Sequence, residues 1–231
     1  QVAGTLKRGL AASHSERRLD RGTKVMSRSW YERVVLPHLL ELACGVQPLR
    51  RQRQKIVPLA RGEVLEIGIG TGLNLPFYDR SRVKSIVGVD PALEMHPLAL
   101  RRVKQAGLAV RMVGLSAEAL PLPDRNFDTI VCTYTLCTIP APDSALAEMH
   151  RVLAPGGKLL FSEHGRAPDE SVRRWQQRLQ PLWGPLAGGC QLGRDIPGLL
   201  RAAGFQLDVQ SMYLPGPRVA SYHYWGDAVA R

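Results

Sequence analysis

The feature that most constrains the fold of this chain is a series of five short apolar runs. They occupy residues 63–67, 85–89, 109–113, 127–133 and 158–163. Runs of this length are typical of strands that are buried on both faces, as in a parallel sheet. Segments with helical periodicity separate the runs. The alternation predicts a doubly wound α/β sheet.

One of the intervening segments shows the helical pattern clearly. Asp143 is a suitable N-cap, and four later residues share one helical face: Leu146, Met149, His150 and Leu153. The sequence Ala-Pro-Gly-Gly at 154–157 predicts the end of this helix.

The last 27 residues show a different pattern. Phe205, Leu207 and Val209 alternate with polar residues, as in a half-buried strand, and residues 219–229 predict a final strand. Only a short segment with a Pro-Gly-Pro turn separates the two, so we expect an antiparallel hairpin.

The length of 231 residues suits one α/β domain with additional elements that cover a substrate. We expect a basic, flexible arm at 1–25, a helical cap at 26–60 and a ligand-binding domain at 61–231. Within the cap, residues 30–44 predict a helix with a break or kink near Pro37. The basic run at 50–55 indicates a connector or a helix surface.

Charge is unevenly distributed. The net charge is +11, and residues 1–61 carry 13 Lys or Arg against 4 Asp or Glu. We interpret the N-terminal excess as a solvated leader, and attraction to anionic lipid at a membrane surface stays open. Residues 1–25 contain no aromatic side chain, which disfavours nucleic-acid binding.

Several other classes are disfavoured. The longest apolar stretch, 34–46, is interrupted and shorter than the roughly 20 residues that a membrane span needs. No secretion signal is recognisable, and the four cysteines have no C-x-x-C pair and no metal-ligand spacing. We therefore expect a cytoplasmic protein with reduced thiols and no metal site. The sequence does not indicate an oligomeric state.

The first apolar run leads into a glycine-rich loop. Gly68, Gly70 and Gly72 stand at alternate positions, where the absence of a side chain permits a tight turn and close approach of a ligand. A helix is expected next, with its first amides directed at an anionic group. Asp90 ends the next strand, 18 residues after Gly72, where a carboxylate can accept hydrogen bonds from ribose hydroxyls.

The loop does not match a dinucleotide site, because Leu73 stands where a third small residue is needed. With Glu66 before it, the loop instead resembles motif I of the class I methyltransferases that use S-adenosylmethionine. The segments 116–121, 127–128 and 151–157 also resemble this class in order and spacing. The resemblance implies a Rossmann-like doubly wound sheet of about seven strands, mostly parallel, with the C-terminal antiparallel hairpin at one edge.

The same resemblance implies a cofactor site for S-adenosyl-L-methionine. The glycines would pass the methionine part, Glu66 would orient the loop or the amino group, and Asp90 would hold the ribose. Ala117 and Glu118 would contact the adenine. The full set of implied cofactor-binding residues is Glu66, Gly68, Gly70, Thr71, Gly72, Asn74, Asp90, Pro91, Ala117, Glu118, Thr133, Thr135 and Leu136.

A narrower resemblance involves the segments 135–137, 162–164 and 189–195. They are similar to the alkyl thiol S-methyltransferases and to proteins grouped with ubiquinone/menaquinone-biosynthesis methyltransferases. The N-terminus differs from the apolar membrane anchor of the alkyl thiol enzymes, since here it is basic and polar. The residues at 133–136 also lack the Asn/Asp-Pro-Pro-Tyr/Phe motif of amide and amino-nitrogen methyltransferases.

Three residues are candidates for catalysis. His164 follows the fifth predicted strand, at the edge where such sheets bind ligands, and could act as a base or only shape the pocket. Arg194 and Asp195 could lie beside the pocket, although an ion pair or a helix cap explains them equally well. Cys137 and Cys190 are better explained as buried small apolar residues than as nucleophiles.

The favoured function is methylation of a small molecule, with a thiol as the acceptor. Two alternatives stay open: methylation of a phospholipid amine or quinone precursor, and a non-catalytic scaffold that binds S-adenosylmethionine.

Overall fold

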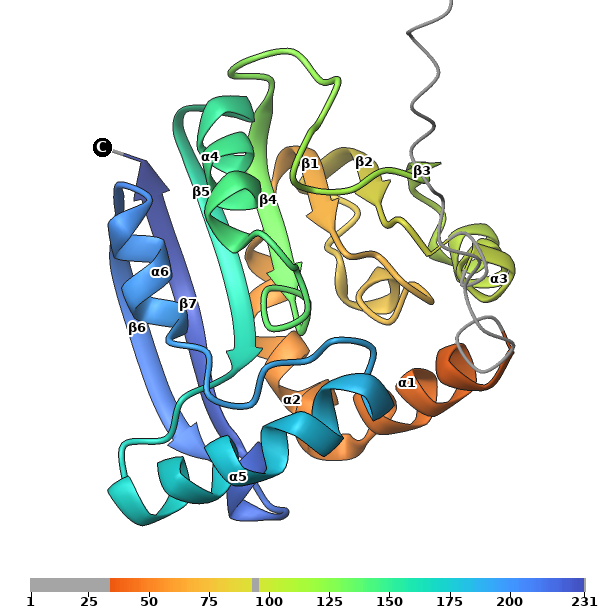
Figure 1. The fold of residues 1–231 in the computed structure, drawn as a ribbon. Helices are drawn as coiled ribbons and strands as arrows, with labels where there is room; N and C mark the ends of the chain where they lie inside the picture. The colour runs from red at the N-terminus through yellow and green to blue at the C-terminus, as the bar shows by residue number, and fades with distance from the viewer. Residues whose placement is uncertain (1–33, 93–95, 231) are drawn as a thin grey trace, which may run out of the picture.

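A seven-stranded sheet with the order β3-β2-β1-β4-β5-β7-β6 forms the centre of the molecule (Figure 1). The computed structural model describes residues 34–92 and 96–230. The strands are β1 (Gly62–Ile67), β2 (Val83–Val89), β3 (Ala109–Val113), β4 (Phe127–Thr133), β5 (Leu153–His164), β6 (Phe205–Tyr213) and β7 (Tyr222–Ala230). β1 to β5 pair in parallel, whereas β7 pairs antiparallel with both β5 and β6. The predicted fold class is therefore confirmed, including the C-terminal hairpin.

Helices cover both faces of the sheet. They are α1 (Leu36–Gly45), α2 (Gln47–Ile56), α3 (His96–Ala106), α4 (Pro142–Val152), α5 (Glu170–Leu186) and α6 (Ile196–Ala202). α4 and α6 bury Leu146, Met149 and Leu200 against one face. On the other face, Ile56 of α2 and Ala106 of α3 pack in a second apolar cluster. Alternate residues of β1 serve the two clusters, which explains its continuous apolar sequence.

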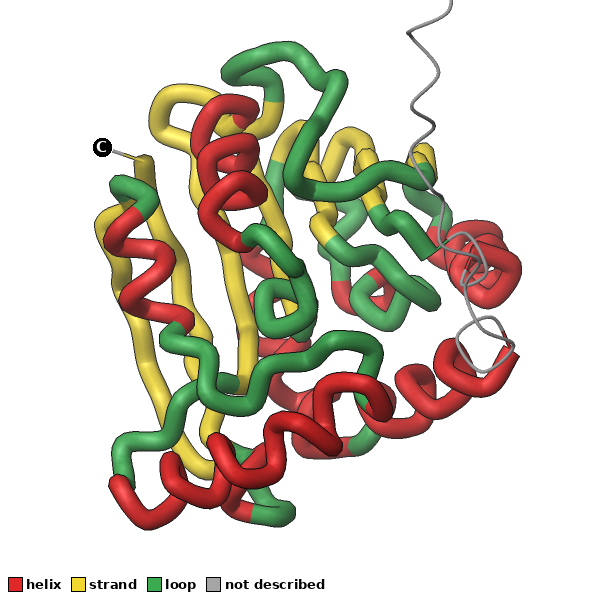
Figure 2. Tube along the Cα trace, viewed as in Figure 1, coloured by secondary structure: helices red, strands yellow, loops and turns green. Residues whose placement is uncertain are grey.

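The connections determine where a ligand can bind. The chain leaves β1 for β2 on one side and returns from β3 to β4 on the other, so the strand order reverses between β1 and β4. In open parallel sheets, such a reversal leaves a crevice at the carboxyl ends of the strands. Loops follow the strand ends there, and α1 and α5 lie across them (Figure 2).

Three local predictions are wrong. No α-helix follows the glycine loop: the described residues between β1 and β2 form only the one-turn 3-10 helix Leu75–Phe77, too short for a helix-terminus anion site. Asp143 is not an N-cap, because α4 begins at Pro142 and Asp143 lies inside its first turn. Leu153, predicted on the face of this helix, instead begins β5, because it pairs with Phe127 of β4; α4 ends at Val152, just before the predicted stop at 154–157.

The cap region is described only in part. Residues 34 and 35 are π-helical, and α1 begins at Leu36 with Pro37 in its first turn, so the helical geometry changes beside Pro37. The basic run 50–55 lies in α2. Residues 1–33, with the predicted arm and the start of the predicted helix 30–44, lie outside the described residues, and the domain boundaries stay predictions. In the part of the chain that is described, no helix is long and apolar enough to cross a bilayer.

Candidate functional site

A cavity of about 490 Å³ opens at the carboxyl ends of β1, β2 and β4. This volume lies within the range of roughly 300–1,000 Å³ that is usual for small-molecule sites. The glycine loop, Asp90 and the loop after β4 form one side of the cavity, while α1 and the end of α5 form the other. The cavity therefore occupies the position that the reversal of strand order predicts.

Gly68 begins the loop after β1 with a backbone conformation that favours glycine. Its φ is +70°, and an added Cβ would lie 2.1 Å from Oγ1 of Thr135. A side chain at this position would therefore collide with the loop that follows β4. Glycine lets the two loops meet and leaves the backbone of residues 68–71 lining the cavity.

Asp90 is held at the end of β2 by backbone amides. Its Oδ2 accepts a hydrogen bond from the Gly70 amide (2.9 Å), and its Oδ1 accepts one from the Ala92 amide (2.8 Å). The carboxylate is buried, with 8% exposure, yet Asp90 lines the cavity. Each carboxylate oxygen can accept more than one hydrogen bond, so a ligand hydroxyl can be added to these contacts.

Glu66 lies beneath the glycine loop in a buried polar network. Its carboxylate accepts hydrogen bonds from Asn74 Nδ2 (2.9 Å) and from the Tyr78 hydroxyl (2.7 Å). Asn74 Nδ2 also donates to Thr133 Oγ1 (3.0 Å). Burial raises the pKa of Glu66 to about 7, although the hydrogen bonds from Tyr78 and Asn74 oppose this shift. Glu66 thereby fixes the position of Asn74, and both residues line the cavity.

Arg53 is a cavity residue that the sequence interpretation missed. It is only 4% exposed and donates to Asn74 Oδ1 (3.1 Å) and to the Cys44 carbonyl (2.7 Å). Its guanidinium lies 4.7 Å from the ring centroid of Tyr134, another lining residue. A basic run indicates solvent exposure, but the helical spacing of Arg53 from Leu49 and Ile56 was a signal of its inward orientation.

Tyr134 is the residue at which β4 turns into the cavity loop. It has a φ of +55°, which is unusual for a residue other than glycine. Its amide donates to the Ser162 carbonyl (2.9 Å), and its ring packs against His223 with centroids 5.7 Å apart. Backbone strain of this kind is common at binding sites, where surrounding contacts maintain it.

Most of the predicted cofactor-binding residues line the cavity. They are Glu66, Gly68, Gly70, Thr71, Asn74, Asp90, Pro91, Ala117, Thr133 and Thr135. Gly72, Glu118 and Leu136 are not lining residues. Glu118 instead accepts a hydrogen bond from the Ala141 amide (2.7 Å) and so ties the loop after β3 to the start of α4. Leu136 is buried, and its amide donates to Glu163 Oε1 (3.0 Å).

The three predicted catalytic residues do not line the cavity. Arg194 donates to the carbonyls of Leu136 (2.5 Å) and Ile139 (2.7 Å), which holds the loop after β4 from behind. Asp195 caps α6 by accepting a hydrogen bond from the Gly198 amide (3.1 Å). Asp195 also lies 3.7 Å from Arg166. The contacts of Asp195 match the predicted alternative of a cap and an ion pair, whereas Arg194 forms neither and binds backbone carbonyls instead.

His164 contacts Cys190 rather than the cavity. Its Nε2 lies 3.0 Å from Cys190 Sγ, and Cys137 is the third member of this cluster. Hydrogen bonds with Cys137, His164 and Trp183 lower the pKa of Cys190, despite burial. Burial opposes a charge on His164, but the contact with Cys190 raises its pKa. Sequence spacing gave no sign of this cluster, because its members come from three separate segments.

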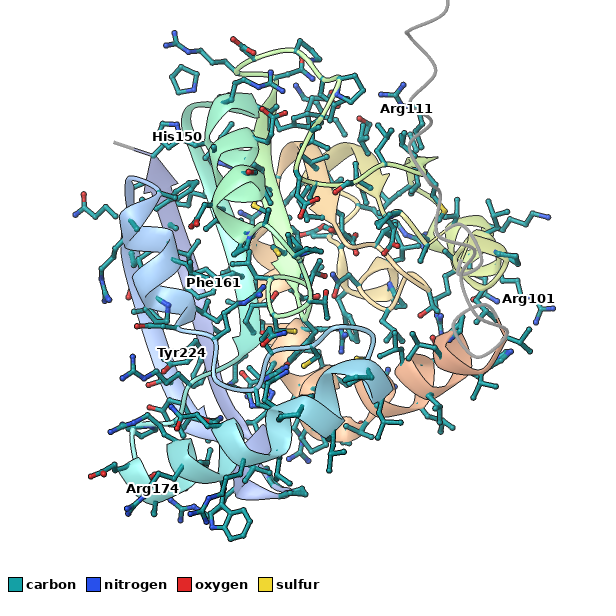
Figure 3. The ribbon with its side chains drawn as sticks, viewed as in Figure 1. Arg101, Arg111, His150, Phe161, Arg174 and Tyr224 are labelled. Atoms are coloured by element: carbon teal, nitrogen blue, oxygen red, sulfur yellow. The ribbon has the colours of Figure 1, made fainter. Side chains whose placement is uncertain are left out.

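The side of the cavity away from the glycine loop is largely apolar. Leu36, Leu40 and Cys44 of α1 face Pro185 and Gly188 from the end of α5. The charged side chains among the described lining residues are Glu41, Arg53, Glu66 and Asp90. Glu41 forms an ion pair with Arg102, and Arg53 is the basic member of this set. Other basic side chains, such as Arg101, Arg111 and Arg174, point away from the protein body (Figure 3).

Comparison with known proteins identifies the class of this site. Residues 65–161 match the family described as Methyltransferase domain. The chain is 34% identical to a thiol S-methyltransferase of Rattus norvegicus over 157 residues, which cover 67% of this chain and 64% of that protein. This chain therefore spans less than two thirds of that relative's length.

Two further comparisons agree. A demethylmenaquinone methyltransferase of Thermus thermophilus is 32% identical over 160 residues, covering 67% of this chain and 73% of that protein. A Thermotoga maritima crystal structure, described as a SAM-dependent methyltransferase and possible histamine N-methyltransferase, superposes with a TM-score of 0.60. The two chains are 24% identical and share the fold. The match covers 87% of this chain and 98% of the Thermotoga chain. The chain belongs to the family of S-adenosylmethionine-dependent methyltransferases.

Proposed function

We propose that this protein transfers a methyl group from S-adenosylmethionine to a small apolar acceptor, and that the acceptor is a thiol. The observation that carries the proposal is the cavity itself. It joins a glycine-lined, carboxylate-bearing half to an apolar half with one basic side chain, Arg53. Such a cavity can hold a polar nucleoside and an apolar acceptor side by side.

The residues of the polar half fit S-adenosylmethionine. A Cβ at Gly68 would fill the loop junction, and the Asp90 carboxylate is already oriented by two amides at the edge of the cavity. Asp90 would hold the ribose hydroxyls, the backbone of residues 68–71 the methionine part, and Ala117 the adenine. When bound, the cofactor supplies an electrophilic methyl group on a sulfonium. Glu66 and Asn74 would orient the amino group from below the loop.

Arg53 supports a thiol acceptor. The nucleophilic form of a thiol is its thiolate, and an unperturbed thiol has a pKa of about 8.5. A fixed guanidinium in a buried site favours the anion and so increases the thiolate fraction near neutral pH. Leu36, Leu40 and Pro185 would exclude water around the acceptor. These residues orient the acceptor, and positioning is the main requirement of an in-line displacement.

The remaining assignments for catalysis are kept as predictions. Arg194 is proposed as a positioning residue, since it holds the carbonyls of Leu136 and Ile139 in the loop that lines the cavity. His164 lies behind the cavity wall, so a role as a base would require an acceptor that reaches past that wall. We favour an indirect role, in which His164 positions Cys190 and the loop at 188–190. Asp195 is proposed to act indirectly, by capping the N-terminus of α6.

A set of matched acceptors tests the proposal. Formation of S-adenosylhomocysteine is measured with an alkane thiol, with the alcohol of the same chain length, with a demethylated quinone and with phosphatidylethanolamine vesicles. The alcohol is the matched control, because it differs from the thiol only in the nucleophilic atom. We expect turnover of the thiol and none of the alcohol. Similarity to the Thermus protein makes the quinone the strongest alternative.

Each other outcome contradicts a defined part of the proposal. Turnover of the quinone or the phospholipid alone would replace the acceptor but keep the enzyme class. Tight binding of S-adenosylmethionine without turnover of any acceptor in the set would favour the non-catalytic scaffold.

A further inference from the structure

Three side chains that can ligate a metal come together behind the cavity wall. Cys137 follows β4, His164 ends β5, and Cys190 follows α5. The two sulfur atoms and the imidazole nitrogen all lie within 4.8 Å of one another. No carboxylate or further histidine joins the group within residues 34–92 and 96–230. The sequence spacing had indicated no metal site, because these residues are distant along the chain.

The backbone holds the two cysteine segments in position independently of any ion. The Gln191 amide donates to the Cys137 carbonyl (2.9 Å), which joins the two segments directly. Gln180 of α5 holds Cys190 on both sides: its Nε2 donates to the Cys190 carbonyl (2.9 Å), and its Oε1 accepts from the Leu192 amide (2.8 Å). A site whose ligands are already fixed loses little conformational entropy when an ion binds.

We propose that Cys137, His164 and Cys190 form a binding site for a thiophilic divalent cation of the Zn²⁺ class. Two sulfur donors and one imidazole nitrogen are the ligand types that select zinc over magnesium or calcium. Zinc binds sulfur at about 2.3 Å and nitrogen at about 2.0 Å, which places the ligand atoms of a tetrahedral site about 3.5 to 4 Å apart. In the cluster, His164 Nε2 lies 3.0 Å from Cys190 Sγ and all three ligand atoms lie within 4.8 Å of one another, distances that bracket this spacing.

The surroundings of the cluster also fit a metal thiolate. The Trp183 indole donates its Nε1 hydrogen to Cys190 Sγ (3.2 Å), a contact that stabilises a sulfur ligand from outside the coordination sphere. With three protein ligands, a tetrahedral ion keeps a fourth position for water or another ligand.

The proposed site lies directly beside the binding cavity. Thr138 and Gly189, the neighbours of two of the ligands, line that cavity. A bound ion would therefore rigidify the wall formed by the loop after β4 and the loop after α5. This inference does not depend on the identity of the methyl acceptor.

Metal titration of the whole 231-residue chain, reduced and treated with a chelator, tests the proposal. We expect one equivalent of Zn²⁺ to bind in competition with a chromophoric chelator. Co²⁺ in its place should give the thiolate charge-transfer band and the intense visible bands of tetrahedral coordination. Cys137→Ala, His164→Ala and Cys190→Ala should each lower Zn²⁺ affinity by more than the roughly 10- to 100-fold that loss of an outer-shell partner costs. Cys132→Ala, which removes a buried thiol outside the cluster, should bind as the unmodified chain does.

A second measurement uses the unmodified protein and avoids any folding defect of the variants. Zn²⁺ should protect Cys137 and Cys190 from alkylation, as read by mass spectrometry, and leave Cys44 unprotected. The proposal is overturned if the protein binds no stoichiometric Zn²⁺ or Co²⁺. It is equally overturned if the folded cluster variants bind as tightly as Cys132→Ala, or if Cys137 and Cys190 form a disulfide and the reduced protein takes up no ion.

Discussion

Asp90 is the residue on which the ribose assignment depends. Removing its carboxylate in Asp90→Ala should weaken binding of S-adenosylhomocysteine by about 1.5–3 kcal/mol, the range for hydrogen bonds to a charged group. This corresponds to a loss of roughly 10- to 150-fold in affinity. Calorimetry measures the change. Asp208→Ala, on the exposed side of the edge strand β6, is the matched control and should bind normally.

Gly68 tests the junction between the glycine loop and the loop after β4. Gly68→Ala should lose at least tenfold in cofactor affinity, because its methyl group would collide with Thr135. Gly156→Ala is an informative control, since Gly156 has a similar φ of +75° but no atom within 4 Å of an added Cβ. The control should show only the cost of the left-handed conformation, about 1–2 kcal/mol of stability. Equal affinity of the two variants for S-adenosylhomocysteine would argue against the close approach.

Arg53 tests the electrostatic part of the thiol proposal. In Arg53→Gln, kcat/KM for an alkane thiol should fall about tenfold near pH 7 and less above pH 9, because the missing charge no longer favours the thiolate. Arg53→Lys should restore much of the activity, and Arg111→Gln on the exposed edge strand β3 should leave it unchanged. A uniform loss of activity at every pH would show that Arg53 only supports the structure.

The raised pKa of Glu66 predicts an unusual pH dependence of the free energy of unfolding. Its pKa is about 7 in the folded protein, above the value of 4.5 for a free carboxyl. Between these two values the folded state binds more protons, so Glu66 makes stability fall as the pH rises from about 4.5 to 7. Glu66→Gln should lack this contribution, which is worth up to about 3 kcal/mol. Urea unfolding of both proteins at pH 5 and pH 8 measures it, and parallel changes would contradict the assignment.

At the scale of elements, the helix cap of α6 can be tested apart from catalysis. Asp195→Ala removes the acceptor for the Gly198 amide and should lower the free energy of unfolding by about 0.5–2 kcal/mol. Asp143→Ala is the matched control, because Asp143 lies in the first turn of α4 without a side-chain cap bond. Thermal denaturation compares the two variants, and equal losses would contradict a capping role.

The elements differ in how well the sequence predicted them. All five central strands were found, because strands buried on both faces give continuous apolar runs. The expected helix after Gly72 was wrong, since no local feature distinguishes it from the single turn Leu75–Phe77 that the packing of Leu75 and Tyr78 favours. The start of β5 at Leu153 was missed as well, because its pairing with Phe127 is a tertiary contact.

At the scale of the whole molecule, the part of the site that directly follows strand ends was predictable. Gly68, Gly70 and Asp90 follow strand ends and were recognised from the order of motifs. Arg53 was missed because a run of basic residues resembles a solvated surface. The cluster of Cys137, His164 and Cys190 was missed because only the folded chain joins its three segments.

The central claim is that the cavity lined by the glycine loop and Asp90 binds S-adenosylmethionine. Isothermal titration of the full chain with S-adenosylhomocysteine, followed by NAD, is its most direct test. We predict one binding event per chain for S-adenosylhomocysteine and no heat with NAD, because Leu73 takes the place of the small residue that a dinucleotide requires. No heat with S-adenosylhomocysteine, or its displacement by NAD, would contradict the account.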